Sequence, residues 1–342
     1  MFLPYPTMKR YHIFALLLAI GFSACNDDNP EAGPSYQGDN TNSNATRIFA
    51  SVTERPNVTD VHKAACRLEI PQLNKAGENN LFIVHTTTDF GINYCMEYDC
   101  DLKAQRWSAF RWDASNSGGY VGRSEAWSED PLIPQEYRTT IDDHKSNNHD
   151  RGHIIASADR QYSYNANAQT YYLSNMHPQL RGFNSRIDDS GKYGYSIWYN
   201  LENRIRNYRI FDIKKNNYFC DTLYVVKGGT IDYEPYVVKG DTIGPKYTWV
   251  KGSGQRLVCP NYFYMAILRK SSKDTTQGGY AAIGFWMKHE ENRTKISDTK
   301  YSQYAVSIDR LEELTGIDFF CNLPDEIEKE VESNLVLSLW GI

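Results

Sequence analysis

Alternating apolar and polar positions mark a series of short strands along the chain. β-Branched and aromatic residues dominate residues 81–87, 93–98 and 107–112, a composition that favours strands. Residues 115–122 consist mainly of Ser, Asn and Gly and predict a loop. The strand composition returns in four later segments: residues 223–226, 262–268, 280–286 and 304–308.

Helical spacing of apolar residues marks fewer segments. Ile197, Leu201, Ile205 and Tyr208 recur every three or four positions, which predicts a helix over residues 196–210. Shorter helices are predicted at residues 308–315 and 325–332, and the second of these is strongly acidic. No internal repeat of 20–50 residues is present. The element order predicts an α+β fold in which helices flank a central, mostly antiparallel sheet.

The first twenty-five residues have the pattern of an export signal. Lys9 and Arg10 precede an apolar run over residues 13–22, which is too short to cross a bilayer. Small residues then lead to Cys25. This ending resembles a bacterial lipoprotein signal, in which Cys25 is lipidated and becomes the mature N-terminus. The alternative is an ordinary cleaved signal with an unmodified Cys25.

The signal pattern and the composition divide the chain into three parts. We interpret residues 1–24 as the signal peptide and residues 25–62 as a flexible tether with a transitional segment, because Asn, Asp, Gly, Ser and Pro leave little to bury. Residues 63–342 form the predicted domain. The protein is expected to be exported and held at the outer membrane or cell surface, with a periplasmic or secreted protein as the alternative.

Bulk composition limits the classes of function. The 342 residues are 41% hydrophobic and 23% charged, which is typical of a folded chain. A formal net charge of −5 argues against a protein that coats nucleic acid by overall charge. The window 145–215 nevertheless holds eleven Lys and Arg against six Asp and Glu, a net charge of +5. A local positive groove of this kind fits contact with a phosphate backbone and predicts strong salt dependence.

Six cysteines follow Cys25. An even number in an exported chain suggests disulfides, although the sequence does not give their pairing. Wide spacing without a C-x-x-C pair argues against a zinc site. The six are Cys66, Cys95, Cys100, Cys220, Cys259 and Cys321.

Residues suited to phosphodiester hydrolysis gather between positions 149 and 206. Histidine suits the removal of a proton from water because its pKa lies near neutrality. Arginine suits a bidentate phosphate contact, and hard cations prefer carboxamide and carboxylate oxygens. On the predicted helix, Glu202 and Arg206 share one face with Trp198, which we expect to anchor the helix in the core. For Glu202 and Arg206 taken alone, a surface ion pair is the favoured interpretation.

An ordered set of motifs resembles the DNA/RNA non-specific endonucleases, which include secreted bacterial nucleases and mitochondrial endonuclease G. The resemblance covers roughly residues 80–322 and implies the ββα-metal, or His-Me finger, fold. Its motifs are Asp150-Arg-Gly-His153, Asn-Met-x-Pro-Gln at residues 175–179, Asn184, and Trp198-x-x-x-Glu202-x-x-x-Arg206.

The resemblance implies roles around a reacting phosphate. His153 is expected to be the general base that takes a proton from water. Asn184 is expected to be the direct protein ligand of one Mg²⁺, for which Mn²⁺ or another divalent cation could substitute. Glu202 is expected to hold that metal through water.

The same resemblance implies substrate contacts. Arg123, Arg151 and Arg206 are expected to bind phosphate, and the last two also to stabilise charge during catalysis. Asn175 is placed with the catalytic residues because it is expected to position the catalytic region. Asp150 is expected to be structural.

Several positions depart from the family pattern or stay outside it. Glu125 follows Gly122-Arg-Ser where some bacterial members carry a second arginine, which weakens the expected substrate affinity. His177 is predicted to be a polar surface residue rather than a metal ligand. His144 and His149 are predicted to be bystanders in a polar loop.

The predicted function is a metal-dependent endonuclease that hydrolyses DNA and RNA through backbone contacts, without reading sequence. The membrane is a partner only through the lipid. The alternative is a catalytically weak surface lipoprotein that binds extracellular nucleic acid. A serine hydrolase is disfavoured because the chain has no Gly-x-Ser-x-Gly elbow. Substrate preference, oligomeric state and biological role stay open.

Overall fold

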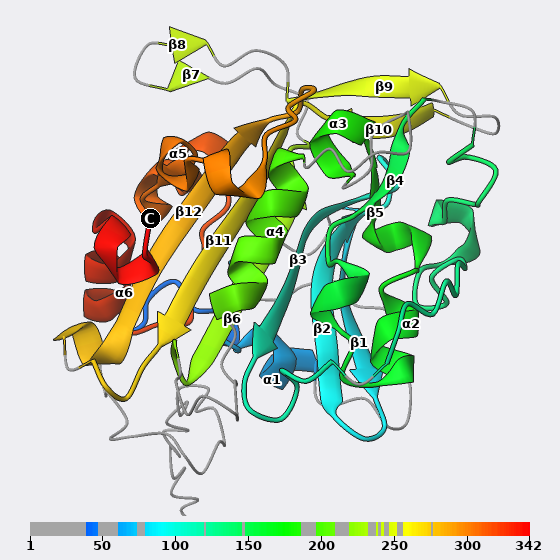
Figure 1. The fold of residues 1–342 in the computed structure, drawn as a ribbon. Helices are drawn as coiled ribbons and strands as arrows, with labels where there is room; N and C mark the ends of the chain where they lie inside the picture. Colours follow the sequence, from blue (N-terminus) through cyan, green and yellow to red (C-terminus); the bar gives the residue numbers. More distant parts are fainter. Residues whose placement is uncertain are drawn as a thin grey trace, which may run out of the picture.

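The fold is described from a computed structural model of the chain (Figure 1). Cys25, the predicted signal peptide and most of the loop between Asn184 and Trp198 lie outside the described residues. The structure describes residues 39–46, 61–73, 79–119, 121–145, 148–185, 196–208, 219–231, 237–238, 241–242, 246–251, 256–274 and 276–342.

A seven-stranded sheet forms the centre of the fold, with the order β1-β2-β3-β6-β11-β12-β13. Every neighbouring pair is antiparallel, as the sequence predicts. The first three strands follow one another as hairpins, whereas β6 reaches β3 only after the long segment that carries the candidate site. The strands are β1 (Asn80–Thr87), β2 (Gly91–Asp99), β3 (Ala104–Trp112), β6 (Thr222–Gly229), β11 (Tyr262–Lys270), β12 (Tyr280–Lys288) and β13 (Ala305–Val306).

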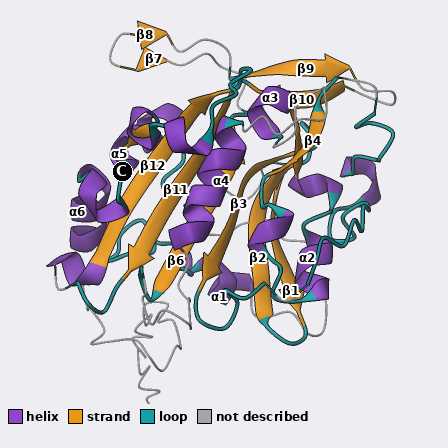
Figure 2. Cartoon of the chain, viewed as in Figure 1, coloured by secondary structure: helices purple, strands orange, loops and turns teal. Residues whose placement is uncertain are grey.

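Helices cover both faces of this sheet, and shorter strands lie beside it (Figure 2). The helices are α1 (Val61–Ala65), α2 (Tyr164–Gln169), α3 (Arg181–Asn184), α4 (Ile197–Tyr208), α5 (Ile308–Thr315) and α6 (Asp325–Ser333). Short 3-10 turns are η1 (Asn44–Thr46), η2 (Gln135–Tyr137), η3 (Ser157–Asp159), η4 (Leu173–Asn175), η5 (Thr276–Gly279), η6 (Ile296–Asp298), η7 (Tyr301–Gln303) and η8 (Leu337–Trp340). Two-stranded pairs are β4 (Asp150–His153) with β5 (Met176–Gln179), β7 (Val237–Val238) with β8 (Asp241–Thr242), and β9 (Tyr247–Lys251) with β10 (Arg256–Pro260).

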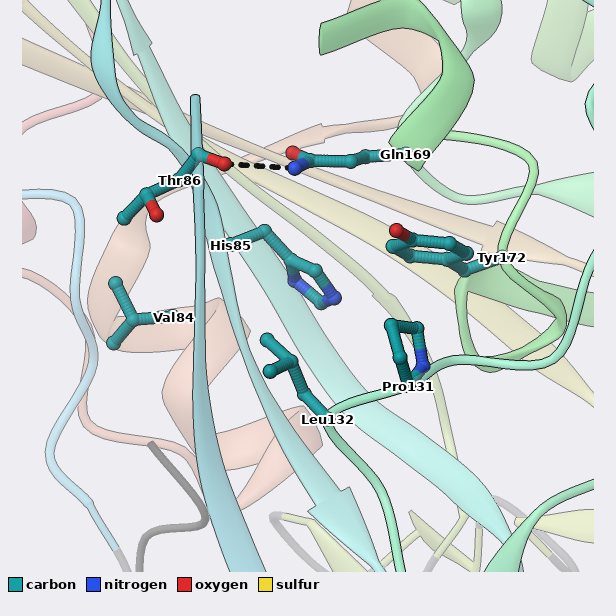
Figure 3. Close-up of a pocket in the computed structure, with 7 residues that line it drawn as sticks. All are labelled: Val84, His85, Thr86, Pro131, Leu132, Gln169 and Tyr172. Carbon is teal, nitrogen blue, oxygen red and sulfur yellow. Dashed lines mark hydrogen bonds between the residues drawn. The ribbon is translucent and has the colours of Figure 1, made fainter. Parts of the chain in front are cut away.

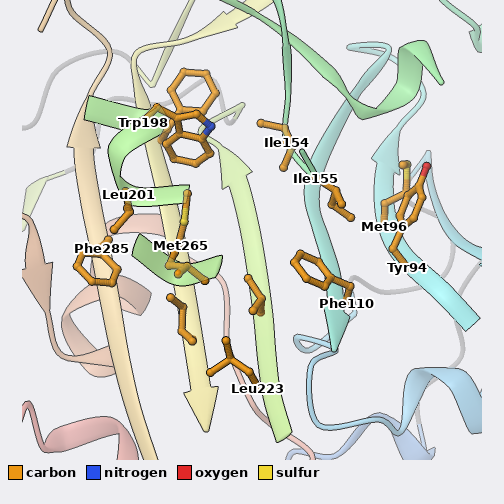
Figure 4. Close-up of a cluster of buried hydrophobic side chains, with 14 of the residues drawn as sticks. Tyr94, Met96, Phe110, Ile154, Ile155, Trp198, Leu201, Leu223, Met265 and Phe285 are labelled. Carbon is orange, nitrogen blue, oxygen red and sulfur yellow. The ribbon is translucent and has the colours of Figure 1, made fainter. Parts of the chain in front are cut away.

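Each central strand buries both of its faces. On β11, Met265 belongs to a core cluster that also contains Trp198 and Leu201 of α4 (Figure 4). Ala266, the next residue, points to the other face and joins a second cluster with Leu311 of α5. This alternation follows from the two-residue period of a strand. It places α4 on one face of the sheet and α5 with α6 on the other.

The helix boundaries follow local signals. Ser307 caps α5, because its hydroxyl accepts a hydrogen bond from the Arg310 amide at 3.2 Å. Gly316 ends α5 with a φ of 70°, a left-handed conformation that glycine adopts without a steric cost. The predicted strand at residues 304–308 is shorter than expected, because only Ala305 and Val306 pair with β12 before the helix begins.

Part of the segment interpreted as a tether is held against the domain. Asn44 is fully buried, and its side-chain amide donates to the carbonyl groups of Ala65 and Pro71, each at 3.0 Å. Thr41 hydrogen-bonds to Asp325 at the start of α6. Residues 39–46 therefore belong structurally to the folded part, although their composition is that of a linker.

The cysteines differ from the expected disulfide framework. Cys66 is disulfide-bonded, but the other five are buried thiols outside any disulfide. Packing explains their burial, because a cysteine without a disulfide behaves as a small apolar residue. The free thiols are Cys95, Cys100, Cys220, Cys259 and Cys321.

Among the described residues, no helix has the length and apolar character needed to cross a membrane.

Candidate active site

The β4–β5 hairpin and α3 form a compact ββα unit that carries the predicted motif. His153 is the last residue of β4 and pairs with Met176 at the start of β5. Gly152 is required here by close packing, since a Cβ atom would lie 2.1 Å from Oε1 of Gln179 on the opposite strand. The chain then turns into α3, which ends at Asn184. The unit therefore links the candidate base and the candidate metal ligand through one hairpin.

Asn175 fixes the backbone that follows His153. Its Oδ1 accepts from the amide of Ile155 at 3.0 Å, and its Nδ2 donates to the carbonyl groups of Ile155 and Thr170 at 3.0 and 2.8 Å. The side chain is fully buried. Because these bonds use its polar atoms on backbone groups, Asn175 is a positioning residue and not a reacting one. These bonds agree with the expectation that Asn175 positions the catalytic region.

Aromatic rings enclose His153. The centroid of the Trp127 ring lies 5.3 Å from the imidazole and that of Tyr171 lies 4.9 Å from it, both edge to face. Burial, together with the nearby positive charges of Arg123 and Arg151, lowers the pKa of His153 to about 3, and this outweighs the opposing effect of Glu125. His153 is therefore neutral at pH 7 and able to accept a proton.

Two of the predicted phosphate-binding arginines lie around this histidine. The Arg151 guanidinium stacks 3.8 Å above the Trp127 ring, a cation–π contact that orients it. Arg123 is 56% exposed and lies 5.5 Å from the centre of the Tyr171 ring. The two rings that these arginines contact, Trp127 and Tyr171, are the same rings that pack against the imidazole of His153. The structure therefore brings Arg123, Arg151 and His153 together.

Glu125 occupies this same surface. Its carboxylate accepts from Nε of Arg123 at 2.7 Å and from the Trp127 indole at 3.1 Å. The hydrogen bond from Arg123 is the main cause that lowers the pKa of Glu125. Glu125 thus holds Arg123 in an ion pair and competes with phosphate for it. This competition is the structural reason for the expected loss of substrate affinity.

Replacing Glu125 with Gln should therefore lower the KM for a polynucleotide by about two- to five-fold, because an exposed ion pair of roughly 0.2–1 kcal/mol no longer competes for Arg123. Steady-state cleavage measured at two salt concentrations checks this, and the difference should shrink as salt screens the charge. Glu290→Gln removes a similarly exposed acid, 3.0 Å from Lys288. An equal decrease of KM in that control would refute a local effect.

Asn184 is held in place by Asp150. Its Nδ2 donates to Oδ2 of Asp150 at 3.3 Å, and the other carboxylate oxygen of Asp150 pairs with Arg181 at 3.3 Å. Since the amide nitrogen makes this bond, the amide oxygen is the atom of Asn184 suited to a hard cation. An amide oxygen beside a carboxylate is a suitable donor set for Mg²⁺. The bonds of Asp150 to Asn184 and Arg181 fit the structural role expected of it, and the same carboxylate lies beside the proposed metal ligand.

Glu202 and Arg206 belong to a buried ionic network. Lys227 of β6 lies 2.6 Å from Oδ2 of Asp159 and 3.3 Å from Oε1 of Glu202. Arg206 lies 2.9 Å from Oδ1 of Asp159 and 4.0 Å from Oε2 of Glu202. The two acids and two bases balance in charge, which is how buried ions are tolerated. Trp198, packed on Phe183 and fully buried, anchors the same helix as predicted.

This network changes the assignment of two predicted residues. The Arg206 side chain is only 10% exposed and is bonded to Asp159, so we assign it to the network and not to the phosphate-binding surface. Burial, followed by the charge of Asp159, raises the pKa of Glu202 against the opposing effects of Lys227 and Arg206. The contact of Glu202 with metal-bound water stays a prediction. An exposed Glu202–Arg206 pair, the favoured interpretation of the two residues alone, is wrong.

Sequence reasoning gave no role to Asp159 and Lys227. The residues before Lys227 in the chain form an apolar strand. A lysine that continues such a strand indicates a buried ion pair, because a buried lysine requires an acidic partner. Asp159 gives no comparable signal. It lies in the short turn η3, and its partners come from segments more than forty residues away.

The remaining histidines differ from one another. His177 is buried, with Nε2 3.2 Å from the carbonyl oxygen of Gln105, so its predicted surface position is wrong. Burial lowers its pKa to about 3. His144 is also buried, and its Nε2 lies 3.3 Å from the hydroxyl of Thr139. In neither case does the structure connect the imidazole with His153.

A small pocket beside β1 is separate from these residues (Figure 3). His85 lies in it, 2.9 Å from a carboxylate oxygen of Asp130, which also accepts from Ser174 at 2.6 Å. The volume of about 80 Å³ is far below the roughly 300 Å³ of small ligand sites. The pocket is therefore too small for a nucleotide. Its lining is formed by Val84, His85, Thr86, Pro131, Leu132, Gln169 and Tyr172.

Comparison with known proteins identifies the family. The sequence model of the DNA/RNA non-specific endonucleases matches residues 78–326. The chain belongs to this family. The match includes all the site residues described above, and it confirms both the predicted family and the predicted class of enzyme, a phosphodiester-hydrolysing nuclease.

Individual members of the family are distant in sequence. The mitochondrial nuclease of Saccharomyces cerevisiae is 28% identical over 216 residues, which are 60% of this chain and 56% of the yeast protein. A nuclease of Nostoc sp. is 26% identical over 71% of this chain and 76% of its own length. The chain therefore spans little more than half of the yeast relative and about three quarters of the Nostoc one.

A solved structure of the EndoG/EndoGI complex confirms the fold. The match covers 70% of this chain and 86% of the chain in that structure, with a TM-score of 0.52 and 21% sequence identity. At this identity the likeness concerns the fold alone. The predicted α+β fold with a mostly antiparallel sheet is confirmed.

Proposed function

We propose that this chain is a metal-dependent endonuclease that hydrolyses DNA and RNA without reading sequence, with His153 as its general base. The observation that carries the proposal is the arrangement of His153 on β4, with Arg123 and Arg151 around it and Asn184 at the end of the same ββα unit. Phosphodiester hydrolysis needs a proton acceptor, positive charge at the phosphoryl oxygens and stabilisation of the leaving oxygen.

The residues of the chain supply the first two requirements. His153 is neutral before substrate binds, because burial, followed by the charges of Arg123 and Arg151, lowers its pKa. A phosphate bound to these arginines offsets their charge, which raises the basicity of His153 when a proton has to be accepted. The arginine pair also positions the phosphate without contact with a base edge, so cleavage is independent of sequence.

Asn184, with Asp150 beside it, would hold the divalent cation, and Mg²⁺ is the proposed ion. When bound, such an ion stabilises negative charge on the phosphoryl and leaving oxygens. The buried network of Asp159, Glu202, Arg206 and Lys227 fixes α4 behind this unit. We further propose export and lipid attachment at Cys25, a proposal supported by the pattern of residues 9–25.

A digestion assay tests the function. Protein that starts at residue 26 should degrade plasmid DNA and structured RNA with Mg²⁺ or Mn²⁺ and lose this activity with a chelator. Absence of cleavage across a panel of divalent metals would refute the proposal. Binding without cleavage in the same assay would instead favour the surface-binding lipoprotein.

A substitution of Asn184 tests separately whether this residue binds the metal. Asn184→Ala should raise the Mg²⁺ concentration needed for half-maximal cleavage by at least about ten- to a hundred-fold, because that is already the cost of losing a residue that only supports a metal ligand. Asn79→Ala is the matched control, because Asn79 also donates to an aspartate, Asp101, at an exposed position. An unchanged Mg²⁺ titration in Asn184→Ala would remove Asn184 as the ligand.

A further inference from the structure

Three carboxylates meet where α5 and α6 pack against each other. Asp309 and Glu312 come from α5, and Glu332 comes from the last turn of α6. Each offers an oxygen, and these oxygens all lie within 4.8 Å of one another. The cluster lies with the core face formed by Leu311 and Val331, opposite the face covered by α4. It is therefore separate from the unit that holds His153.

The innermost carboxylate is Glu332. It is only 6% exposed, and its Oε1 is buried without a hydrogen-bond partner among the described residues. A buried carboxylate oxygen without a partner is costly, because it loses its hydration without compensation. A carboxylate oxygen of this buried side chain lies within 4.8 Å of an oxygen of each of the two neighbouring carboxylates.

The surroundings add negative charge. Burial, followed by the charges of Glu312, Glu328 and two aspartates, raises the pKa of Glu332 to about 11. The pKa of Glu312 is raised to about 8, also mainly by burial. A divalent cation among the three carboxylates would supply the positive charge that offsets their mutual repulsion.

We propose that Asp309, Glu312 and Glu332 form a second divalent-cation site, and that Ca²⁺ is the ion that fits it best. Oxygen atoms that lie within 4.8 Å of one another can share one Ca²⁺, whose bonds to oxygen are roughly 2.3–2.6 Å long. Ca²⁺ also accepts irregular arrangements of carboxylates with water, whereas Mg²⁺ requires a near-ideal octahedron.

Such an ion would join the two C-terminal helices to the N-terminal segment. Glu312 accepts from the amide of Phe319 at 2.7 Å, which connects the cluster to the turn after α5. Asn42 donates to Glu328 at 2.9 Å and to Asp318 at 3.3 Å beside the same cluster. Neutralising the cluster therefore stabilises the contact between α5, α6 and residues 39–46. The expected role is structural, and cleavage chemistry does not depend on it.

Thermal unfolding with Ca²⁺ or EGTA tests the site, in an Asn184→Ala background so that the proposed catalytic metal does not contribute. Millimolar Ca²⁺ should raise the Tm by about 4 °C if the Kd is on the order of 10⁻⁴ M. Glu332→Gln should abolish the increase. Glu330→Gln, an exposed position on the same helix, should keep it.

Equilibrium dialysis with ⁴⁵Ca²⁺ gives the second readout. One bound ion per chain should be present in Asn184→Ala and in its Glu330→Gln derivative, and be absent in its Glu332→Gln derivative. If Glu332→Gln does not fold, Asp309→Asn, at an exposed position, should weaken Ca²⁺ binding at least ten-fold. A Tm that ignores Ca²⁺ in all variants and rises on acidification would show that the carboxylates share protons, and would overturn the proposal. Neither readout uses nucleic acid, so its failure is distinguishable from failure of the proposed nuclease.

Discussion

Replacing His153 with Ala should lower the cleavage rate by about 10²–10⁴-fold, the usual contribution of a positioned general base. The imidazole is neutral at the working pH because its pKa is about 3, and the rings of Trp127 and Tyr171 hold its orientation. Removing it leaves Arg123 and Arg151 in place, so substrate should still bind. Single-turnover cleavage of a labelled duplex gives the rate, and fluorescence anisotropy gives the binding.

A matched control separates a chemical role from a structural one. His149→Ala changes a histidine four residues earlier, outside the hairpin, and should leave the rate unchanged. Added imidazole should restore part of the rate of His153→Ala, because it can occupy the space left by the side chain and accept the proton. Cleavage by His153→Ala within about three-fold of the wild-type rate would show that another group is the base.

The sequence was sufficient for the elements whose apolar pattern is local. The central strands and α4 follow from alternation and from helical spacing, and Trp198 anchors α4 as expected. The segment at 304–308 was less predictable, because its length depends on where β12 offers a partner and on the cap at Ser307. Local composition does not contain either of these constraints.

The candidate site was predictable where residues adjoin in the chain. His153, Arg151 and Asn184 lie within one ββα unit, so an ordered motif identifies them together. His177 lies in the same motif, but its burial depends on the carbonyl group of Gln105, seventy-two residues earlier. Contacts of this kind come from the tertiary fold, and for that reason a polar residue in a loop-like sequence was expected at the surface.

The same limit applies to the buried network, where the pairing partners are far apart. Glu202 and Arg206 looked like a surface pair because they are four residues apart on a helix. Asp159, from η3, and Lys227, from β6, are the partners that make the site buried and neutral. Only the packing of α4 against the sheet brings the four together, and no period in the sequence encodes that contact.

Asp159→Asn should lower the free energy of unfolding by about 3–5 kcal/mol, the cost of breaking a buried ion pair by removing one partner. The substitution conserves shape but removes the charge that faces Lys227 at 2.6 Å and Arg206 at 2.9 Å. Two buried cations then share Glu202 alone, whose contact with Arg206 is 4.0 Å long. Urea unfolding followed by circular dichroism measures the loss as a lower midpoint.

Asp142→Asn provides the comparison for this variant, because it makes the same chemical change in a pair whose members, Asp142 and Lys145, are 71% and 59% exposed. Water and salt already screen that pair, so its midpoint should stay at the wild-type value. The double variant Asp159→Asn with Lys227→Met should recover part of the lost stability, since it removes one of the two uncompensated cations. Equal midpoints for Asp159→Asn and Asp142→Asn would mean that water reaches the network, and that α4 is held by its apolar contacts alone.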